Sequence, residues 1–515
     1  MKKKCLSVLL TAVMGLTMLA GCGDAASDNT ASSGAGSSAE SNVESDAGSD
    51  AGSGEGTNTS DEIVTLTFAT LGVESACQEQ VLAAVNEKLL ADGLNIQVQV
   101  KQLDDYWNKL ALDIAGGTEY DLAWAHSSTL ADMVSKKVYQ PITEAMDTVG
   151  QDLKAKTPDY VLTGGTIDGQ LYAIPRVIPT TGFSNTFDVR KDLMTKYGME
   201  DITTIEELEA YFQAVLDNED GMYPYVGSNI QTIFPVYGNY HYLVGDGLYA
   251  LYVDPEDPDL TVKNAWASEE YETMFNKKLE WAQKGWLISD VTAIESGDNG
   301  FDYGKVAAVD SNVMRVTERV DSLATNVPEA EAYTVYLEPE QRWIFSAGDN
   351  MLAVPSTSKH VEEAVQLIQW FKCNQDNFDL WSYGVEGVNW EKVGEAVDVT
   401  NISSENIYSP MTWMWNDIDM ARFSTNYSEE NLARLRSWDD NSQASPLLGF
   451  TIDQTNIKSE ISQIQAIISE YGADLGTGKL VYADVKDEIL SKLEAAGIDK
   501  VIEEVQAQVN AFAGK

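Results

Sequence analysis

Tryptophan side chains next to polar residues are the chemically most informative feature of this sequence. The chain contains 12 Trp and 23 Tyr among 515 residues. An indole ring can cover the apolar face of a sugar ring, while a neighbouring Asp, Asn, Arg or Gln binds the hydroxyl groups at its rim. The segment Trp413-Met414-Trp415-Asn416 places two indoles on the same side of the chain if it is extended. These residue types predict a site for a small polar molecule with flat apolar faces.

Further candidates lie at expected strand ends and in segments that cross between lobes. The complete set of candidate ligand-binding residues is Trp124, His126, Ser127, Arg176, Trp343, Trp381, Tyr383, Trp413, Trp415 and Asn416. Each tryptophan has an alternative role in the hydrophobic core, and Arg176 has an alternative role in a structural ion pair. Trp281, Trp286 and Trp370 fall within helical patterns, where we expect core packing.

Sequence motifs for catalysis or metal binding are weak. His126, His241 and His360 are far apart, and none has the H-E-x-x-H spacing of a zinc site. No G-x-S-x-G motif occurs. Residues 472–479 are similar to a phosphate-binding loop, but the glycines are one residue too far apart and Leu480 stands where Ser or Thr is required. We therefore predict no catalytic residues, no metal and no cofactor, although a pair of catalytic carboxylates would be invisible among 81 acidic residues.

The charge balance excludes one class of partner. The chain has 34 Lys plus Arg against 81 Asp plus Glu, which gives a formal net charge of −47. Such a field repels nucleic acid, and no basic stripe exists to release its counterions. The four cysteines are too few for a disulfide scaffold. Two alternatives remain for Cys77 and Cys373, a disulfide outside the cell or free thiols.

The amino terminus predicts export and lipid anchoring. Met1-Lys2-Lys3-Lys4 precedes an apolar run that is too short to span a bilayer. Its end, Leu19-Ala20-Gly21-Cys22, resembles the bacterial lipobox, whose cysteine receives diacylglycerol. We expect residues 1–21 to be a signal peptide and Cys22 to be lipidated; the alternative is an ordinary signal peptide that ends near a cysteine. Residues 22–60 contain the lipidated Cys and a disordered linker rich in Ser, Gly and acids.

The globular body begins with alternating strand and helix patterns. Strands are expected at 63–69, 96–100 and 120–125, with helices at 81–89 and 104–115 between them. This order predicts a parallel sheet covered by helices. Ligands of such sheets bind outside the carboxyl ends of the strands. The candidate residues Trp124, His126 and Ser127 lie at this end of the third expected strand.

Several local signals continue through the rest of the chain. A turn within Gly164–Pro175 joins two short strands, and the capping box Thr204-Ile205-Glu206-Glu207 starts a helix. The other expected elements are strands at 304–309 and 350–355 and amphipathic helices at 361–371 and 501–512.

The order of these motifs resembles extracellular solute-binding lipoproteins of ABC importers, in the large carbohydrate-type class. The segments that carry the resemblance include the Asp168-Gly169 turn before Tyr172, the segment Arg190-Lys191-Asp192-Leu193 and the segment Gly304-Lys305-Val306-Ala307. Residues 383–387, 449–453 and 495–501 are similar to a Gram-positive subgroup with a C-terminal domain of unknown function. The chain departs from the pattern at Ala125-His126-Ser127, where the family has Thr-Gly-Ser, so the ligand contacts there are expected to differ.

The resemblance implies an α/β fold with two lobes, the type II fold of periplasmic binding proteins, with a hinge between the lobes. Each lobe is expected to have a largely parallel sheet. Lobe 1 would comprise residues 61–178 and about 348–410. Lobe 2 would comprise residues 179–347 and about 411–515, with a family-specific helical region at its end.

The resemblance also implies a function. A lipid-anchored monomer at the extracellular face of the cell membrane would capture a small solute, with an oligosaccharide as first choice, and deliver it to the permease subunits of an ABC importer. No bond needs to be made or broken, so no enzymatic activity is expected. A receptor for a cationic peptide or polyamine is the alternative, because the chain is strongly acidic. A surface glycoside hydrolase is a less favoured third option.

Overall fold

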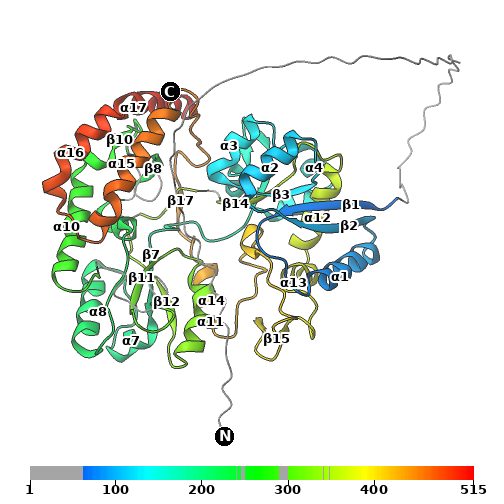
Figure 1. Cartoon of the computed structure of the whole chain (residues 1–515), viewed down its shortest axis with the longest axis horizontal. Helices are drawn as coiled ribbons and strands as arrows, with labels where there is room; N and C mark the ends of the chain where they lie inside the picture. Colours follow the sequence, from blue (N-terminus) through cyan, green and yellow to red (C-terminus); the bar gives the residue numbers. More distant parts are fainter. Residues whose placement is uncertain (1–61, 239, 245–249, 289–299, 340, 347) are drawn as a thin grey trace, which may run out of the picture. The chain divides into compact units, whose positions relative to one another are not determined.

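The structure is a computed structural model that describes residues 62–238, 240–244, 250–288, 300–339, 341–346 and 348–515. Figure 1 shows the order of its helices and strands. The predicted signal peptide, the lipidation site Cys22 and the linker to residue 60 lie outside the described residues. Among the helices that the structure describes, none combines the length and the apolar character needed to cross a membrane.

Five strands form the first sheet, in the order β2-β1-β3-β14-β6. β1 pairs in parallel with β2 and β3, as predicted, whereas β14 runs antiparallel to both β3 and β6. Because β14 follows β6 by more than 170 residues in sequence, the sheet is completed by a segment that returns from the second part of the chain. The bounds are β1 Val64–Thr70, β2 Ile96–Gln102, β3 Leu122–His126, β6 Ala173–Pro175 and β14 Asn350–Ala353.

Helices cover both faces of this sheet (Figure 1). Leu66 and Phe68 of β1 pack in one hydrophobic cluster with α1, α12 and α13, while Ala69 packs in a second cluster with α2 and α3. Because side chains alternate along β1, this strand contributes to the hydrophobic clusters on both faces of the sheet. The bounds are α1 Gln78–Ala91, α2 Tyr106–Ala115, α3 Ser127–Ser135, α4 Thr143–Thr148, α5 Gln151–Lys156, α6 Asp159–Thr163, α12 Val361–Lys372 and α13 Gln375–Tyr383.

A short hairpin, β4 Thr166–Ile167 and β5 Gln170–Leu171, confirms the predicted turn. Asp168 and Gly169 form its tip with φ angles of 50° and 75°. Positive φ at both central residues is the conformation whose twist matches a two-residue hairpin, and Asp-Gly is a preferred pair for it. The tip is thereby held in one conformation beside the end of α6.

The second sheet contains β7 Thr186–Arg190, β11 Ala308–Ser311 and β12 Ala332–Tyr336, in the order β11-β7-β12. Both outer strands run antiparallel to β7, so the expectation of a largely parallel sheet is wrong here. β11 and β12 share one direction and are joined through α11, Val316–Asn326, while β7 lies between them in the opposite direction. Sequence periodicity reports burial, and it does not report strand direction.

Helices of the second core come from both the middle and the end of the chain. The predicted capping box starts α8: the Glu207 amide donates to Thr204 Oγ1 at 3.3 Å, and the Thr204 amide donates to Glu207 Oε2 at 3.0 Å. The C-terminal helices α15 and α16 pack beside α10, and α17 packs on α15 and α16 (Figure 1). The bounds are α7 Lys191–Lys196, α8 Ile205–Asn218, α9 Phe234–Tyr237, α10 Glu269–Gln283, α14 Glu429–Arg436, α15 Lys458–Gly476, α16 Tyr482–Ala495 and α17 Ile498–Phe512.

The remaining strands are short and join distant segments. One three-stranded sheet contains β8, β9 and β10, and β13 pairs with β17. The bounds are β8 His241–Val244, β9 Leu251–Val253, β10 Lys263–Asn264, β13 Trp343–Ile344, β15 Glu391–Val393, β16 Ala396–Asp398 and β17 Gln443–Ala444.

Separate hydrophobic clusters lie around the two sheets. The clusters at the first sheet draw on residues 66–174 and 351–381, and also on Met414, Trp415 and Met420. The large cluster at the second sheet draws on residues 187–337 and 447–509. The lobe boundaries stay a prediction. Cys77 is buried and Cys373 is exposed, and both are free thiols.

His241 contributes a pH-dependent term to stability. The imidazole is 8% exposed, and its Nδ1 lies 2.8 Å from Ser445 Oγ. Burial disfavours the charged ring and lowers the pKa of His241 to about 4. The unfolded chain therefore binds a proton on this residue below about pH 6.5 that the native protein does not bind, so this contribution to stability is lost as the pH falls toward 4.

We expect His241→Gln to have a flatter pH dependence of stability than the wild type. When the pH falls from 7 to 4.5, the free energy of unfolding of the wild type should decrease by about 2–3 kcal/mol more than that of His241→Gln. The reason is that only the wild type must keep a buried imidazole neutral. Urea unfolding at both pH values measures this difference. Parallel pH profiles would contradict the buried, neutral state of His241.

Candidate functional site

Three half-buried tryptophans meet at the carboxyl end of β3. The rings of Trp107 on α2 and Trp124 on β3 lie 4.4 Å apart between centroids, with their planes tilted by 40°. Trp413 meets Trp124 edge-on at 5.1 Å and 85°. Below them, the buried Tyr106 donates its hydroxyl to the carbonyl of Trp124 at 2.8 Å. We call Trp107, Trp124 and Trp413 the tryptophan cluster.

A chain of hydrogen bonds orients the tryptophan cluster. Trp124 Nε1 donates to Asn350 Oδ1 at 2.8 Å, and Asn350 Nδ2 donates to Asp349 Oδ2 at 3.0 Å. Asp349 also accepts from Arg176 Nε at 2.7 Å and Nη2 at 2.6 Å. Arg176 Nη1 then donates to the carbonyl of Trp413 at 3.1 Å. The guanidinium is buried, so the structure places Arg176 in the structural ion pair that was its alternative role, and its role as a ligand contact stays a prediction.

His126 and Ser127 lie at the same sheet edge. The His126 ring is 6.3 Å from the Trp124 ring, and its Nδ1 accepts from the amide of Ser128, which caps α3. The amide of Ser127 donates to the carbonyl of Asp349 at 2.8 Å. Both predicted residues are half-buried beside the tryptophan cluster.

Trp415 does not join Trp413 on one side of the chain. Residues Thr412–Met414 form a 3₁₀ turn, so the segment is not extended and the condition for two indoles on one side is not met. A 3₁₀ turn rotates each residue by about 120° from the previous one, which sends neighbouring indoles in different directions. Trp415 is 3% exposed and packs on Phe68 and Trp381, and its Nε1 donates to Ser382 Oγ at 3.1 Å.

The other candidates, Trp343, Trp381, Tyr383 and Asn416, make contacts of their own elsewhere in the structure. Trp381 is buried and stacks on Phe371 at 5.1 Å. The Tyr383 hydroxyl accepts from the amide of Arg422 at 2.8 Å. Trp343 is buried in β13. The backbone carbonyl of Asn416 accepts a hydrogen bond from the amide of Val177 at 2.9 Å, and Val177 lies on a segment that links the two sheets. Their assignment as ligand residues stays a prediction.

Trp107 was missed by the sequence analysis. The buried stripe of α2 is Tyr106, Leu110 and Ile114, and Trp107 follows the first of these on a flank of that stripe. One signal could have identified Trp107. It is a large aromatic residue outside the buried stripe of its helix, and that helix precedes the strand whose end was expected at the site.

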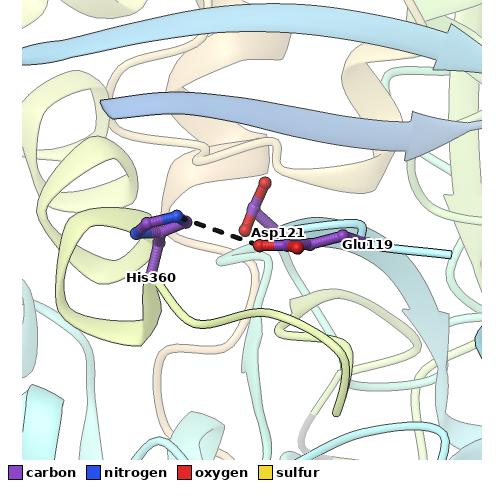
Figure 2. A group of neighbouring side chains, drawn as sticks. All are labelled: Glu119, Asp121 and His360. Atoms are coloured by element: carbon purple, nitrogen blue, oxygen red, sulfur yellow. Dashed lines mark ion pairs between the residues drawn. The ribbon is translucent and has the colours of Figure 1, made fainter. Parts of the chain in front are cut away.

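Another cluster lies at the opposite, amino end of β3. Glu119, Asp121 and His360 point toward one another between the start of β3 and the start of α12 (Figure 2), with ligand atoms within 4.8 Å. Carboxylates and an imidazole suit a divalent cation. However, Lys359 Nζ already neutralises Glu119 at 2.8 Å, and the buried Asp121 accepts from Ser358 Oγ at 2.6 Å. These contacts join β3 to α12, and we assign the cluster that structural role.

Comparison with known proteins identifies the family. The sequence profile for "Bacterial extracellular solute-binding protein" matches residues 78–375, more than half of the chain. The chain belongs to this family. The profile for a domain of unknown function, DUF3502, matches residues 446–514. Both parts of the predicted resemblance are confirmed.

Relatives of this solute-binding protein are known from Streptococcus pneumoniae. A carbohydrate ABC transporter substrate-binding protein is 24% identical over 448 residues, which cover 84% of this chain and 88% of that protein. The crystal structure of the N-glycan transport solute-binding protein NgtS is 20% identical, covers 88% of this chain and 99% of its own, and superposes with a TM-score of 0.73. Its complex with Man1GlcNAc, also 20% identical, covers 88% and 100% with a TM-score of 0.66. Its complex with Man5GlcNAc, 21% identical, covers 88% and 99% with a TM-score of 0.62. The predicted fold class, the two-lobed type II fold, is confirmed by these likenesses.

The two neighbouring tryptophans of the 413–415 segment should respond differently to truncation. We expect Trp415→Ala to lower the free energy of unfolding by about 3–5 kcal/mol, because it empties a buried site among aromatic rings. Trp413→Ala should cost less than about 2 kcal/mol, since its ring is only half-buried. Urea unfolding of both variants measures the two losses. Equal losses would contradict the division of the segment between core and surface.

Proposed function

We propose that this solute-binding protein captures an oligosaccharide and delivers it to the permease subunits of an ABC importer. The observation that carries the proposal is the tryptophan cluster at the carboxyl end of β3. The S. pneumoniae relative named as a carbohydrate substrate-binding protein and the glycan complexes of NgtS support the choice of ligand.

The geometry of the cluster suits sugar rings. The half-buried Trp107 and Trp124 have indole planes tilted relative to each other, and Trp413 stands perpendicular to Trp124. An indole face covers the C–H face of a sugar ring, and the perpendicular ring closes one side of it. The Asp349 side chain keeps 25% of its surface exposed beside the cluster and can accept hydrogen bonds from hydroxyl groups.

Delivery follows from closure of the two lobes around the bound solute. The proposal takes residues 61–178 and about 348–410 as lobe 1, and residues 179–347 and about 411–515 as lobe 2. A solute that contacts both lobes binds the closed state more tightly than the open one, and the permease recognises the closed state. A shift from 1:99 to 99:1 in favour of closure requires about 5.5 kcal/mol of differential binding free energy.

The proposal includes a lipid anchor at Cys22. Cleavage after Gly21 would leave Cys22 as the first residue, carrying acyl chains in the outer leaflet of the cell membrane. The linker to residue 60 would then act as a coil that spans on the order of 35 Å. A monomeric receptor held within this distance of its transporter meets it at a high effective concentration.

Truncation of the tryptophan cluster should weaken sugar binding. We expect Trp107→Ala and Trp124→Ala each to raise the Kd for neutral oligosaccharides about tenfold or more, because each loses one face of ring contact. Isothermal titration calorimetry with Man1GlcNAc, Man5GlcNAc and maltotetraose, with spermidine and a cationic tripeptide for comparison, measures the change. Leu112→Ala is the matched control, since Leu112 is 70% exposed on the same helix as Trp107.

Two outcomes would contradict the proposed function. One is that the Kd for sugars does not change in the Trp107 and Trp124 variants while their melting temperatures stay at the wild-type value. The other is that the wild type binds spermidine or the cationic peptide and none of the sugars, which would establish the cationic-solute alternative.

Lipid anchoring can be tested in cells. We expect Cys22→Ser to abolish incorporation of labelled palmitate and to shift the protein from the membrane fraction to the culture medium, because the acyl chains are the proposed anchor. Cys77→Ser is the matched control, since Cys77 is a buried thiol in the globular body. Membrane retention of an unlabelled Cys22→Ser protein would contradict the anchor.

A further inference from the structure

A small cavity lies at the carboxyl ends of β1 and β2. Its volume is about 40 Å³. Thr70 ends β1 and Gln102 ends β2, and both residues line the cavity. The other walls come from the loop after β1, from Gln78 at the start of α1 and from residues 408–411. We call this cavity the amide pocket, because Gln78 and Gln102 contribute side-chain amides to its lining.

The amide pocket and the tryptophan cluster lie at the same edge of the first sheet. β1 and β3 pair in parallel, with Ala69 opposite Ala123. The next residues along the two strands are Thr70, which lines the pocket, and Trp124. Neighbouring strands of a sheet are about 4.8 Å apart. The pocket therefore begins one strand away from Trp124, at the carboxyl ends of both strands.

The segment that carries Trp413 forms a second connection. Thr70 Oγ1 donates to Met414 Sδ at 3.3 Å, and the Met414 amide donates to the Met411 carbonyl at 3.0 Å. Met411 lines the pocket. A Cβ on Gly72 would lie 2.8 Å from Met411 Cε, so glycine lets the loop after β1 close on this side chain. The same turn of chain thus borders the pocket and carries Trp413 of the tryptophan cluster.

One buried amide in the pocket has an unused hydrogen-bonding atom. Gln78 is 8% exposed, and its Oε1 accepts from Gln102 Nε2 at 2.8 Å. Its Nε2 donates to no other residue in the part of the chain that the structure describes. If oxygen and nitrogen are exchanged in both amides, one atom of Gln78 is still left over. Because a buried polar atom is costly without a partner, this amide is suited to a ligand that supplies one.

The rest of the lining is uncharged and largely apolar. The buried Phe68 and Trp415 lie in the wall, and no Asp, Glu, Lys or Arg is present among the described residues that line the pocket. An ionic group would therefore be buried without a counter-ion. A water molecule needs roughly 10–15 Å³ of such volume, so the pocket has room for about three atoms of this size. It fits a small neutral group with one hydrogen-bonding end and one apolar end.

We propose that the amide pocket binds the acetamido group of an N-acetylhexosamine residue in the captured oligosaccharide. The inference rests on the proposed function and deepens it. The acetamido carbonyl accepts from Gln78 Nε2, its N–H donates to Gln102 Oε1, and its methyl group contacts Phe68 and Trp415. The sugar ring stays outside the pocket at the edge of the sheet, where the next ring of the ligand meets the tryptophan cluster. The pocket thereby selects N-acetylated sugars over their hydroxyl and amine analogues.

The first experiment compares ligands that differ only in this group. The full-length wild type is titrated by calorimetry with Man1GlcNAc, with the mannosyl-glucose and mannosyl-glucosamine of the same linkage, and with the N-propionyl analogue of Man1GlcNAc. We expect the Kd for mannosyl-glucose and mannosyl-glucosamine to be about tenfold higher or more, because both lack the carbonyl and the methyl group. The N-propionyl analogue should also bind more weakly, since the pocket has no room for a further methylene.

The second experiment changes the amide. We expect Gln78→Leu to reduce the preference for Man1GlcNAc over mannosyl-glucose from about tenfold to twofold or less, because the carbonyl loses its donor. Gln80→Leu is the matched control, since Gln80 is exposed on the same helix and does not line the pocket. Trp124→Ala should weaken both sugars and keep the preference. Melting temperatures of all variants separate a loss of binding from a loss of folding.

The possible failures are distinguishable. If the wild type binds sugars without preferring Man1GlcNAc over mannosyl-glucose, or if the N-propionyl analogue binds as tightly, the acetamido pocket is refuted while the proposed function stands. The same conclusion follows if Gln78→Leu keeps the full preference. If Gln78→Leu does not fold, the ligand series on the wild type decides by itself. If the wild type binds none of these sugars and no other sugar, the proposed function fails, and the pocket fails with it.

Discussion

The tryptophan cluster depends on one ion pair, between the buried Arg176 and the half-buried Asp349. Arg176 follows β6 and Asp349 precedes β14, so two segments that are 173 residues apart are joined where they leave the first sheet. The same guanidinium holds the Trp413 carbonyl, and the same carboxylate accepts from Asn350, which orients Trp124. Because the planar guanidinium fits the carboxylate in two parallel hydrogen bonds, the geometry of all three segments is fixed together. Removing one partner of such a pair would leave an uncompensated buried charge.

Two lysines, the buried Lys372 and the exposed Lys156, hold the segment that carries Trp413. Lys372 Nζ donates to the Trp415 carbonyl at 3.0 Å, and Lys156 pairs with the buried Asp417 at 2.9 Å. Burial lowers the pKa of Lys372 to about 8. In a chain with 34 basic and 81 acidic residues, basic side chains used in this way stabilise the connections between the sheets and leave the surface acidic.

The C-terminal helices connect the second core to the first sheet. Val501, Val505 and Val509 of α17 are buried in the large cluster around the second sheet. The same helix holds Asp453 through Gln508, and this segment reaches the β4–β5 hairpin beside the first sheet. One helix therefore packs into the second core with its apolar stripe and contacts the segment 448–453 with another side. This arrangement gives the domain of unknown function a direct contact with the part of the chain that precedes β6.

Local sequence signals determined the elements that depend on neighbouring residues. The strands β1 and β2, the Asp168-Gly169 turn and the capping box at Thr204 were predicted because each is set by contacts within a few residues. Only the tertiary structure decided the direction of the second sheet, the place of Trp107 in the cluster and the separation of Trp413 from Trp415. Whether an indole is exposed depends on which distant segment covers it: Trp415 is covered by Phe68 and Trp381, whereas Trp413 meets Trp124, some 290 residues earlier in the chain. Such long-range contacts leave no periodic trace in the sequence, because they are fixed by packing and buried charge after the local elements have formed.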